Sequence, residues 1–144
     1  MAYTDDSLGF NLNRTNIKLK NAWTQHLKPY GVKPEQCAVL FCLWEQDGVS
    51  PKDLSFLVCK DAPTTVRILE KLIKKGLIKR EADLFDKRSY RIYLTAQGCA
   101  LQGEVYAALA VALQHALKGI TQDEKLLFMK LLKQIYTNLE SEEL

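Results

Sequence analysis

Apolar side chains recur at helical spacing over most of the chain. Between Asp6 and Lys28 they form a stripe along one helix, and the Pro-Tyr-Gly of residues 29–31 closes it. Pro34 then suits the first turn of a second helix, and Gly48 suits its end. This second helix is expected to be largely buried, through Ala38, Phe41, Cys42 and Trp44.

Two shorter helices with clear start signals follow. Ser50, Pro51 and Asp53 form a variant of the capping box, and the helix they start is expected to bury Leu54, Leu57 and Val58. Asp61 is the expected N-cap of the next helix, and Gly76 ends it. The apolar positions that recur along this helix are Val66, Leu69, Leu72 and Ile73.

Alternation of apolar and polar residues replaces helical spacing after Gly76. Residues 77–82 and the segment that ends at Thr95 predict two antiparallel strands, with Tyr90, Ile92 and Leu94 on the inward face. The turn between the strands is polar and basic. Two helices joined by a tight turn and followed by a β-hairpin predict a winged helix-turn-helix.

The chain returns to helix after Gly98. A segment rich in Ala and Leu runs to Gly119, and the capping box of residues 121–124 opens a last helix. The predicted fold class is therefore mainly α with a small β-hairpin (α+β): a winged helix-turn-helix lobe plus N- and C-terminal helices. These outer helices carry more apolar surface than one small lobe can bury, which predicts an obligate homodimer.

Composition fits one folded domain. The 144 residues are 47% hydrophobic and 26% charged, and the net charge is +3. The charge is unevenly distributed: residues 60–93 hold ten Lys or Arg against five acids, so that this segment is +5 and the remainder is −2. A basic middle segment indicates a surface that faces a polyanion, although a solvated helix face would carry similar charges.

The second helix of a helix-turn-helix enters the major groove of double-stranded DNA, where its N-terminal residues meet the base edges. The candidates for base contact are Pro63, Thr64, Thr65 and Arg67, although ordinary N-terminal helix chemistry competes for the threonines, more for Thr64 than for Thr65. Further along the same helix, Lys71, Lys74 and Lys75 are expected to contact phosphates. Ser50, at the start of the first helix of the pair, is a further candidate for DNA contact.

The hairpin turn ends in two adjacent cations. A wing of this kind lies over the neighbouring minor groove, whose negative potential attracts a guanidinium, so Arg88 is the candidate for insertion. Asp86 is expected to orient Arg88 through a side-chain pair, and Lys87 to contact the backbone.

Other kinds of chemistry have little support in the sequence. Zinc spacing is absent around the cysteines, which are expected to be unpaired and mostly buried, with a redox switch as an alternative: Cys37, Cys42, Cys59 and Cys99. No nucleophile–base pattern or phosphate-binding glycine loop is present, so the sequence predicts neither an enzyme nor a metal or cofactor. Acids at the N-terminus and the short apolar run of residues 105–117 predict a cytoplasmic protein without a membrane span.

Residues 72–98, LIKKGLIKREADLFDKRSYRIYLTAQG, resemble the signature of the multiple-antibiotic-resistance regulator (MarR) family. That signature has a Gly-Leu-Ile/Val-x-Arg strand, an Asp-x-Arg wing tip and a Leu-Thr-x-x-Gly exit. The chain has them as residues 76–80, 86–88 and 94–98. The order of helices resembles the family over essentially the whole chain.

The resemblance implies a single domain over residues 1–144, with dimerisation helices at 5–30 and 96–140 and a DNA-binding lobe at 33–95. It also implies a transcriptional regulator, mostly a repressor in this family, that binds a palindromic operator and is released by a small aromatic or lipophilic effector. Oxidation-sensing members carry a cysteine near the start of the first helix, whereas this chain has none before Cys37.

Aromatic and polar residues suggest where an effector would bind. Trp23, His26, Tyr30 and Trp44 are the candidate lining, because ligand sites combine aromatic walls with a few polar groups. The competing interpretation places both tryptophans in the core. A competing function for the whole chain is a winged-helix module that docks proteins and binds no DNA.

Overall fold

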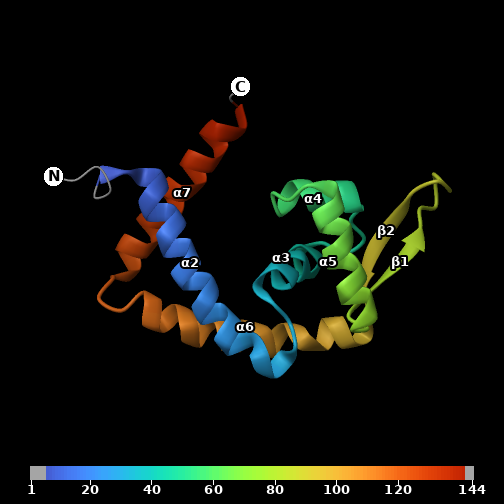
Figure 1. Cartoon of the computed structure of the whole chain (residues 1–144), viewed down its shortest axis with the longest axis horizontal. Coiled ribbons are helices and arrows are strands. Elements are labelled where there is room, and N and C mark those ends of the chain that lie inside the picture. Colours follow the sequence, from blue (N-terminus) through green and yellow to red (C-terminus); the bar gives the residue numbers. More distant parts are fainter. Residues whose placement is uncertain (1–5, 142–144) are drawn as a thin grey trace. The chain divides into compact units, whose positions relative to one another are not determined.

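The computed structural model describes residues 6–141 and confirms the predicted fold class (Figure 1). The elements are α2 (Leu8–Leu27), the 3-10 turn η1 (Lys28–Tyr30), α3 (Pro34–Glu45), α4 (Pro51–Leu57), α5 (Ala62–Lys74), β1 (Ile78–Ala82), β2 (Tyr90–Leu94), α6 (Ala96–Ala116) and α7 (Gln122–Ser141). Across the described residues, every helix is too short or too polar to cross a membrane.

The chain divides into two compact units, one up to Ala112 and one from Leu113 onwards. The boundary between the units falls inside α6, so the first unit holds α2 to β2 and most of α6, and the second holds α7. The single domain with boundaries at residues 30, 33, 95 and 96 stays a prediction.

The predicted helix caps are confirmed. Ser50 Oγ accepts from the Asp53 amide at 3.1 Å, and Asp61 Oδ1 accepts from the Thr64 amide at 2.7 Å, so each side chain satisfies an amide that the first helical turn leaves unpaired. At the end of α5, Gly76 adopts a left-handed φ of 74°. This conformation brings the Leu77 amide to the Leu72 carbonyl at 3.1 Å and turns the chain into β1.

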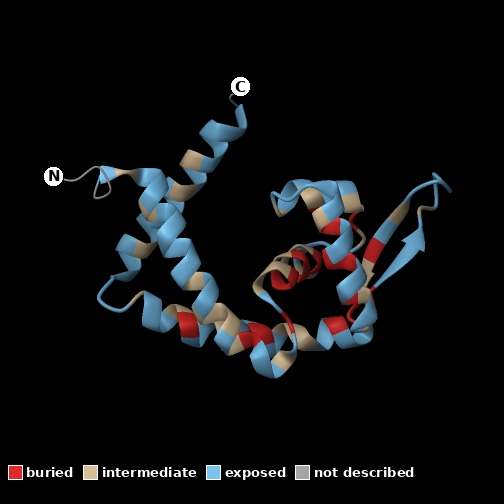
Figure 2. Cartoon of the chain, in the orientation of Figure 1, coloured by how far each residue is buried: buried red, intermediate tan, exposed pale blue. Residues whose placement is uncertain are grey.

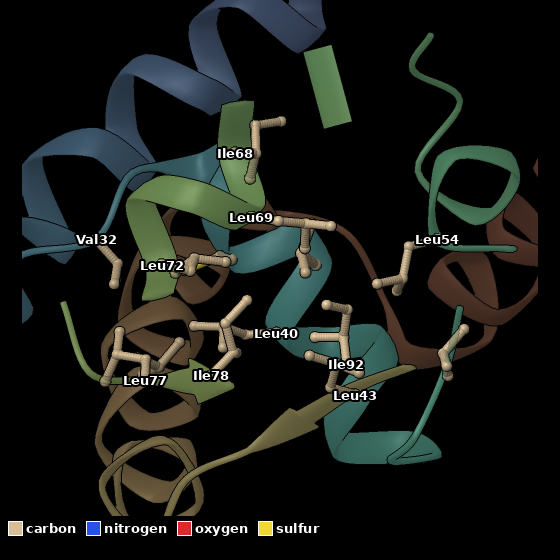
Figure 3. Close-up of a cluster of buried hydrophobic side chains, with 14 of the residues drawn as sticks. Val32, Leu40, Leu43, Leu54, Ile68, Leu69, Leu72, Leu77, Ile78 and Ile92 are labelled. Carbon is tan, nitrogen blue, oxygen red and sulfur yellow. The ribbon is translucent and has the colours of Figure 1, made fainter. Parts of the chain in front are cut away.

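The core of the first unit is built between α3, α5 and the hairpin (Figure 2). Close to its centre, Leu40 and Leu43 of α3 lie among Leu69 of α5 and Ile78 and Ile92 of the two strands (Figure 3). Each of these side chains is at most 2% exposed. The hairpin is thus anchored to α5 by shared burial.

The helix α3 is largely buried, as predicted, but mainly through residues other than those expected. Ala38, Phe41, Cys42 and Trp44 are only half-buried, and the fully buried residues of α3 are Gln36, Cys37, Val39, Leu40 and Leu43. Apolar residues occur on every side of this helix, so its sequence carries little contrast between an inner and an outer face.

The expected buried faces of the two short helices were partly wrong. Leu54 is buried, whereas Leu57 is exposed, because a helix of only two turns presents few positions to the core. In α5, Leu69 and Leu72 are buried as predicted, but Ile68 takes the place expected for Val66, which is 37% exposed.

The two strands pair in the antiparallel register that joins Ile78 to Leu94 and Ala82 to Tyr90. Val49, just before α4, adds a bridge to Ile92 on the other edge of β2. β2 is therefore central and β1 forms the outer edge, and only Ile78 of β1 is buried. Lys79 and Glu81 pair across one face of β1 at 3.2 Å.

The exit from the hairpin is a tightly packed joint. Thr95 Oγ1 donates to the Gly76 carbonyl at 2.6 Å and accepts from the Gly98 amide at 3.1 Å, so it caps α6 and ties α6 to the end of α5. A Cβ on Gly98 would lie 2.1 Å from the Leu77 carbonyl oxygen, which leaves no room for any side chain. The Leu-Thr-x-x-Gly motif is this joint.

The outermost helices leave many apolar side chains in solvent. In α2 only Leu27 is buried, and Leu8, Phe10, Leu12 and Ile17 are exposed. No described residue of α7 is buried; its exposed apolar residues are Leu126, Leu127, Phe128, Met129, Leu131, Tyr136 and Leu139.

Candidate nucleic-acid interface

The solvent face of α5 carries most of the predicted major-groove residues. Pro63 and Arg67 are exposed and Thr64 is half-buried at the N-terminal end, where a recognition helix meets base edges. Lys71 and Lys74 are exposed one and two turns further on. The two ends of the helix thus separate candidate base contacts from candidate phosphate contacts.

Thr65 does not belong to this face. It is 0% exposed, and its Oγ1 donates to the Asp61 carbonyl at 2.9 Å. A hydroxyl that is buried and already donates to the backbone cannot reach a base edge while α5 stays packed. The prediction that Thr65 contributes to sequence choice is therefore wrong, and helix-start chemistry accounts for Thr65 more fully than for Thr64.

Two residues of this surface were missed. Val66 was assigned to the core, but it is exposed between Thr64 and Arg67, where its methyl groups could contact a thymine. Arg80 of β1 joins Arg67, Lys71 and Lys74 around a hollow of about 470 Å³ beside α5. Arg80 also lies over the Tyr90 ring at 4.9 Å, which holds the guanidinium against the first residue of β2, at the loop end of the paired strands.

Lys75, for which a phosphate contact was expected, makes hydrogen bonds within the chain. Its Nζ donates to the Gly31 carbonyl and, at 2.7 Å, to Gln36 Oε1. Partial burial, together with Lys33 and Lys71, lowers the pKa of Lys75. Lys75 thus ties the end of α5 to the linker between α2 and α3.

Ser50 is at the surface but is largely occupied as a cap. Its Oγ accepts from the Asp53 amide, which leaves the hydroxyl proton to offer to a phosphate.

The wing tip is a loop built from two aspartate turns. Asp83 Oδ1 accepts from the amides of Phe85 and Asp86 at 2.8 and 3.3 Å, and Asp86 Oδ1 accepts from the Arg88 amide at 3.0 Å. The Asp83 amide donates to the Ser89 carbonyl at 3.0 Å and closes the loop.

The predicted pair between Asp86 and Arg88 is present. Arg88 Nε lies 3.6 Å from Asp86 Oδ1, and the Arg88 side chain is 94% exposed. Lys87 is exposed beside it. Asp86 therefore does two things: it organises the backbone of the turn and holds the guanidinium near its own side of the loop.

Arg91 clamps the base of the wing. Its Nε binds Asp83 Oδ2 at 2.9 Å, and one terminal nitrogen donates to the Gly48 carbonyl at 2.8 Å. Hydrogen bonds from the Phe85 amide first, and from Arg91 second, lower the pKa of Asp83, so its carboxylate stays charged and the tip stays closed at neutral pH.

The four residues predicted to line an effector cleft are not gathered around a described cavity. Trp44 Nε1 donates to the Gly98 carbonyl at 3.0 Å, and the Trp44 ring packs with Phe41 and Tyr106. A hollow of about 360 Å³ lies between α3, α4 and β2, and Trp23, His26, Tyr30 and Trp44 are all absent from its lining. Trp23 Nε1 is buried and has no hydrogen-bond partner among the described residues.

The cysteines differ from one another in their surroundings. None of the four forms a disulfide; Cys37 is buried, Cys42 is half-buried, and Cys59 and Cys99 are exposed, so the expectation of mostly buried thiols was wrong. Burial raises the pKa of Cys37 to about 12. Within residues 6–141, no three His, Cys, Asp or Glu side chains cluster in a way that could hold a metal.

Comparison with known proteins agrees with this geometry. The model of the MarR family matches residues 32–90. The multiple antibiotic resistance protein MarR of Escherichia coli is 26% identical over 129 residues, which span 89% of this chain and 90% of that protein.

Two crystal structures are similar over nearly the whole chain. A probable transcriptional regulator from Pseudomonas aeruginosa is 30% identical with a TM-score of 0.83, over 91% of this chain and 98% of that one. A mutant of Escherichia coli MarR complexed with operator DNA has a TM-score of 0.84 at 24% identity and shares the fold over 94% of this chain and 99% of that one.

The fold is a winged helix-turn-helix whose second helix, α5, is basic and exposed, and the similar proteins are transcriptional regulators. The protein is therefore a DNA-binding transcriptional regulator. The chain belongs to the MarR family, as the signature in residues 72–98 predicted.

Proposed function

We propose that the protein is a cytoplasmic, sequence-specific repressor that binds a palindromic operator as a homodimer. The observation that carries this proposal is the basic surface shared by α5 and the hairpin. It comprises Arg67, Lys71, Lys74 and Arg80, which surround one hollow together with the single acid Glu70, and the exposed guanidinium of Arg88 at the wing tip. Such a surface can follow one half-site, with α5 in the major groove and the wing over the adjacent minor groove.

Homodimerisation is supported by the apolar side chains that α2 and α7 leave in solvent. Exposed apolar surface of this extent is typical of a protein–protein interface. Two lobes related by a twofold axis would read two half-sites separated by about 34 Å, one helical turn of DNA, and this symmetry makes the operator palindromic.

Release by a small aromatic or lipophilic molecule is the regulatory part of the proposal. The buried Nε1 of Trp23, which lacks a partner among the described residues, is a hydrogen-bond donor that a ligand could satisfy. Salicylate and related aromatics are the first compounds to test, with Trp23→Phe as the variant that keeps the ring surface and removes the donor.

Selection of bound fragments from genomic DNA, followed by sequencing and titration, tests DNA binding. A shared palindrome is the expected result, with an affinity that falls as salt rises.

Arg88→Ala should weaken binding to all variants of that duplex similarly and reduce the salt slope by about one counterion. Asp86→Ala should also weaken binding, although it removes a negative charge, because Arg88 loses its orientation. Absence of DNA binding even at low salt would favour the protein-docking alternative.

A further inference from the structure

The tip of the wing carries two large apolar side chains in full contact with solvent. Leu84 is 93% exposed and Phe85 is 97% exposed, and every other large apolar residue among residues 6–141 is at most 65% exposed. A single exposed apolar residue is ordinary, but two adjacent ones at the end of a projecting hairpin add nothing to the core. Their position therefore indicates an external partner.

Leu84 and Phe85 lie in a closed loop. The Phe85 amide donates to Asp83 Oδ1 at 2.8 Å, and the second oxygen of Asp83 is held by Arg91 at 2.9 Å. The polar groups of the loop are used by the loop itself, while the two apolar side chains are left without contacts that bury them. The loop is therefore preorganised for binding, because it need not rearrange to expose Leu84 and Phe85 to a partner.

The surroundings of the pair restrict what the partner can be. Lys87 and Arg88 follow in the same loop, both exposed, and Arg88 is held next to the Asp86 carboxylate at 3.6 Å. The two acids on either side of the pair are each matched by an arginine, Asp83 by Arg91 and Asp86 by Arg88. An apolar pair in a loop that also presents two exposed cations fits a partner with a negative rim and an apolar interior. The minor groove of double-stranded DNA has this combination, since phosphates line its rim, sugars line its walls, and a step that opens exposes its apolar base faces.

We propose that Leu84 and Phe85 form an apolar wedge that enters the minor groove beside Arg88 and partly unstacks a base step. The wedge rests on the proposed placement of the wing over the minor groove. Apolar residues that insert in this way bend the duplex, and flexible pyrimidine–purine steps unstack most readily. The wing would therefore favour a flexible base step at this position, where Arg88 alone distinguishes little between base pairs because the minor-groove code is degenerate.

The experiment uses the full-length protein and a duplex recovered by selection from a random pool. The duplex carries 2-aminopurine at the steps under the wing and a donor–acceptor pair of dyes at its ends. Binding of the wild-type protein should raise the 2-aminopurine fluorescence and shorten the distance between the dyes.

Phe85→Ala should weaken binding about tenfold or more and reduce both signals, because it removes most of the buried apolar surface of the wedge. It should leave the salt dependence unchanged, because no charge is lost. Arg88→Ala should do the reverse, reducing the salt slope while the unstacking signal persists. Phe85→Leu, which keeps an apolar side chain, should retain most of the unstacking.

Phe56→Ala is the matched control, since Phe56 is a 65% exposed phenylalanine of the same lobe that lies on α4. It should leave affinity and both signals unchanged. If the wild-type protein binds the duplex but Phe85→Ala keeps full affinity and both signals, the wedge is refuted and the proposed function stands. If the wild-type protein binds no duplex, both fail. Loss of binding to anionic phospholipid vesicles in Phe85→Ala, with DNA binding intact, would also refute the wedge and assign the tip to a lipid surface.

Discussion

At the scale of single residues, we expect Arg67 to be the side chain of α5 that selects sequence, since it is exposed six residues after the Asp61 cap. Arg67→Ala should cost about 1–3 kcal/mol on the matched operator and little on a scrambled duplex. Thr65→Val is the control: it should lower stability by about 1 kcal/mol, through loss of the bond to Asp61, and leave discrimination unchanged. Equal losses on both duplexes for Arg67→Ala would make this residue a phosphate contact.

Cys37 should resist thiol reagents in the folded protein. Burial raises its pKa to about 12, so at neutral pH the thiol is protonated and shielded. Iodoacetamide followed by mass spectrometry should modify Cys59 and Cys99 first, and Cys37 only after urea unfolds the chain. Modification of Cys37 at the rate of Cys59 would show that α3 opens readily.

The sequence predicted those residues whose role depends on near neighbours in the chain. Ser50 and Asp61 are caps, and Asp86 pairs with Arg88, because each interaction spans two or three residues. Lys75 was beyond prediction, because its partners Gly31 and Gln36 lie about forty residues away. Thr65 was misassigned because successive residues of a helix point about 100° apart, so that Thr65 faces the core while Pro63 and Arg67 are exposed.

At the scale of elements, the joint between the hairpin and α6 fixes where the wing projects. Gly98→Ala should destabilise the protein by about 1–3 kcal/mol, because its Cβ would meet the Leu77 carbonyl at 2.1 Å. Gly103→Ala, in the same helix with nothing within 4 Å, should instead stabilise it by about 0.5–1 kcal/mol. Urea unfolding measures both changes. Similar urea midpoints for the two variants would mean that the backbone around Gly98 and Leu77 can shift to accommodate a Cβ.

Elements with contrasting faces were predicted well and uniform ones were not. Alternation in β2 predicted the burial of Ile92, and helical spacing in α5 predicted Leu69 and Leu72. In α3 nearly every side is apolar, and the packing of α5 and β2 decides which side is covered. Which residues of α3 are buried therefore depends on tertiary packing, and the sequence of α3 by itself does not reveal it.

At the scale of the whole molecule, the exposed apolar residues of α2 and α7 lead us to expect an obligate dimer. Deleting everything after Lys118 should abolish dimerisation and operator binding in analytical ultracentrifugation and titration, because one lobe alone holds a single half-site. Leu131→Glu should act in the same direction, and Gln134→Glu, a polar and exposed position of α7, is the charge-matched control. A truncated chain that remains a soluble, DNA-binding monomer would contradict the dimer.

The sheet order, with β2 between Val49 and β1, has a consequence for how the protein behaves when it is crowded among copies of itself. The outer edge of β1 pairs with no other strand of residues 6–141, and an open edge is a template on which a foreign strand can add. Lys79, Arg80 and Glu81 occupy that strand and are all exposed. An incoming strand would have to desolvate these charges, so we expect the short strand that borders the proposed DNA-facing surface to protect the protein from aggregation as well.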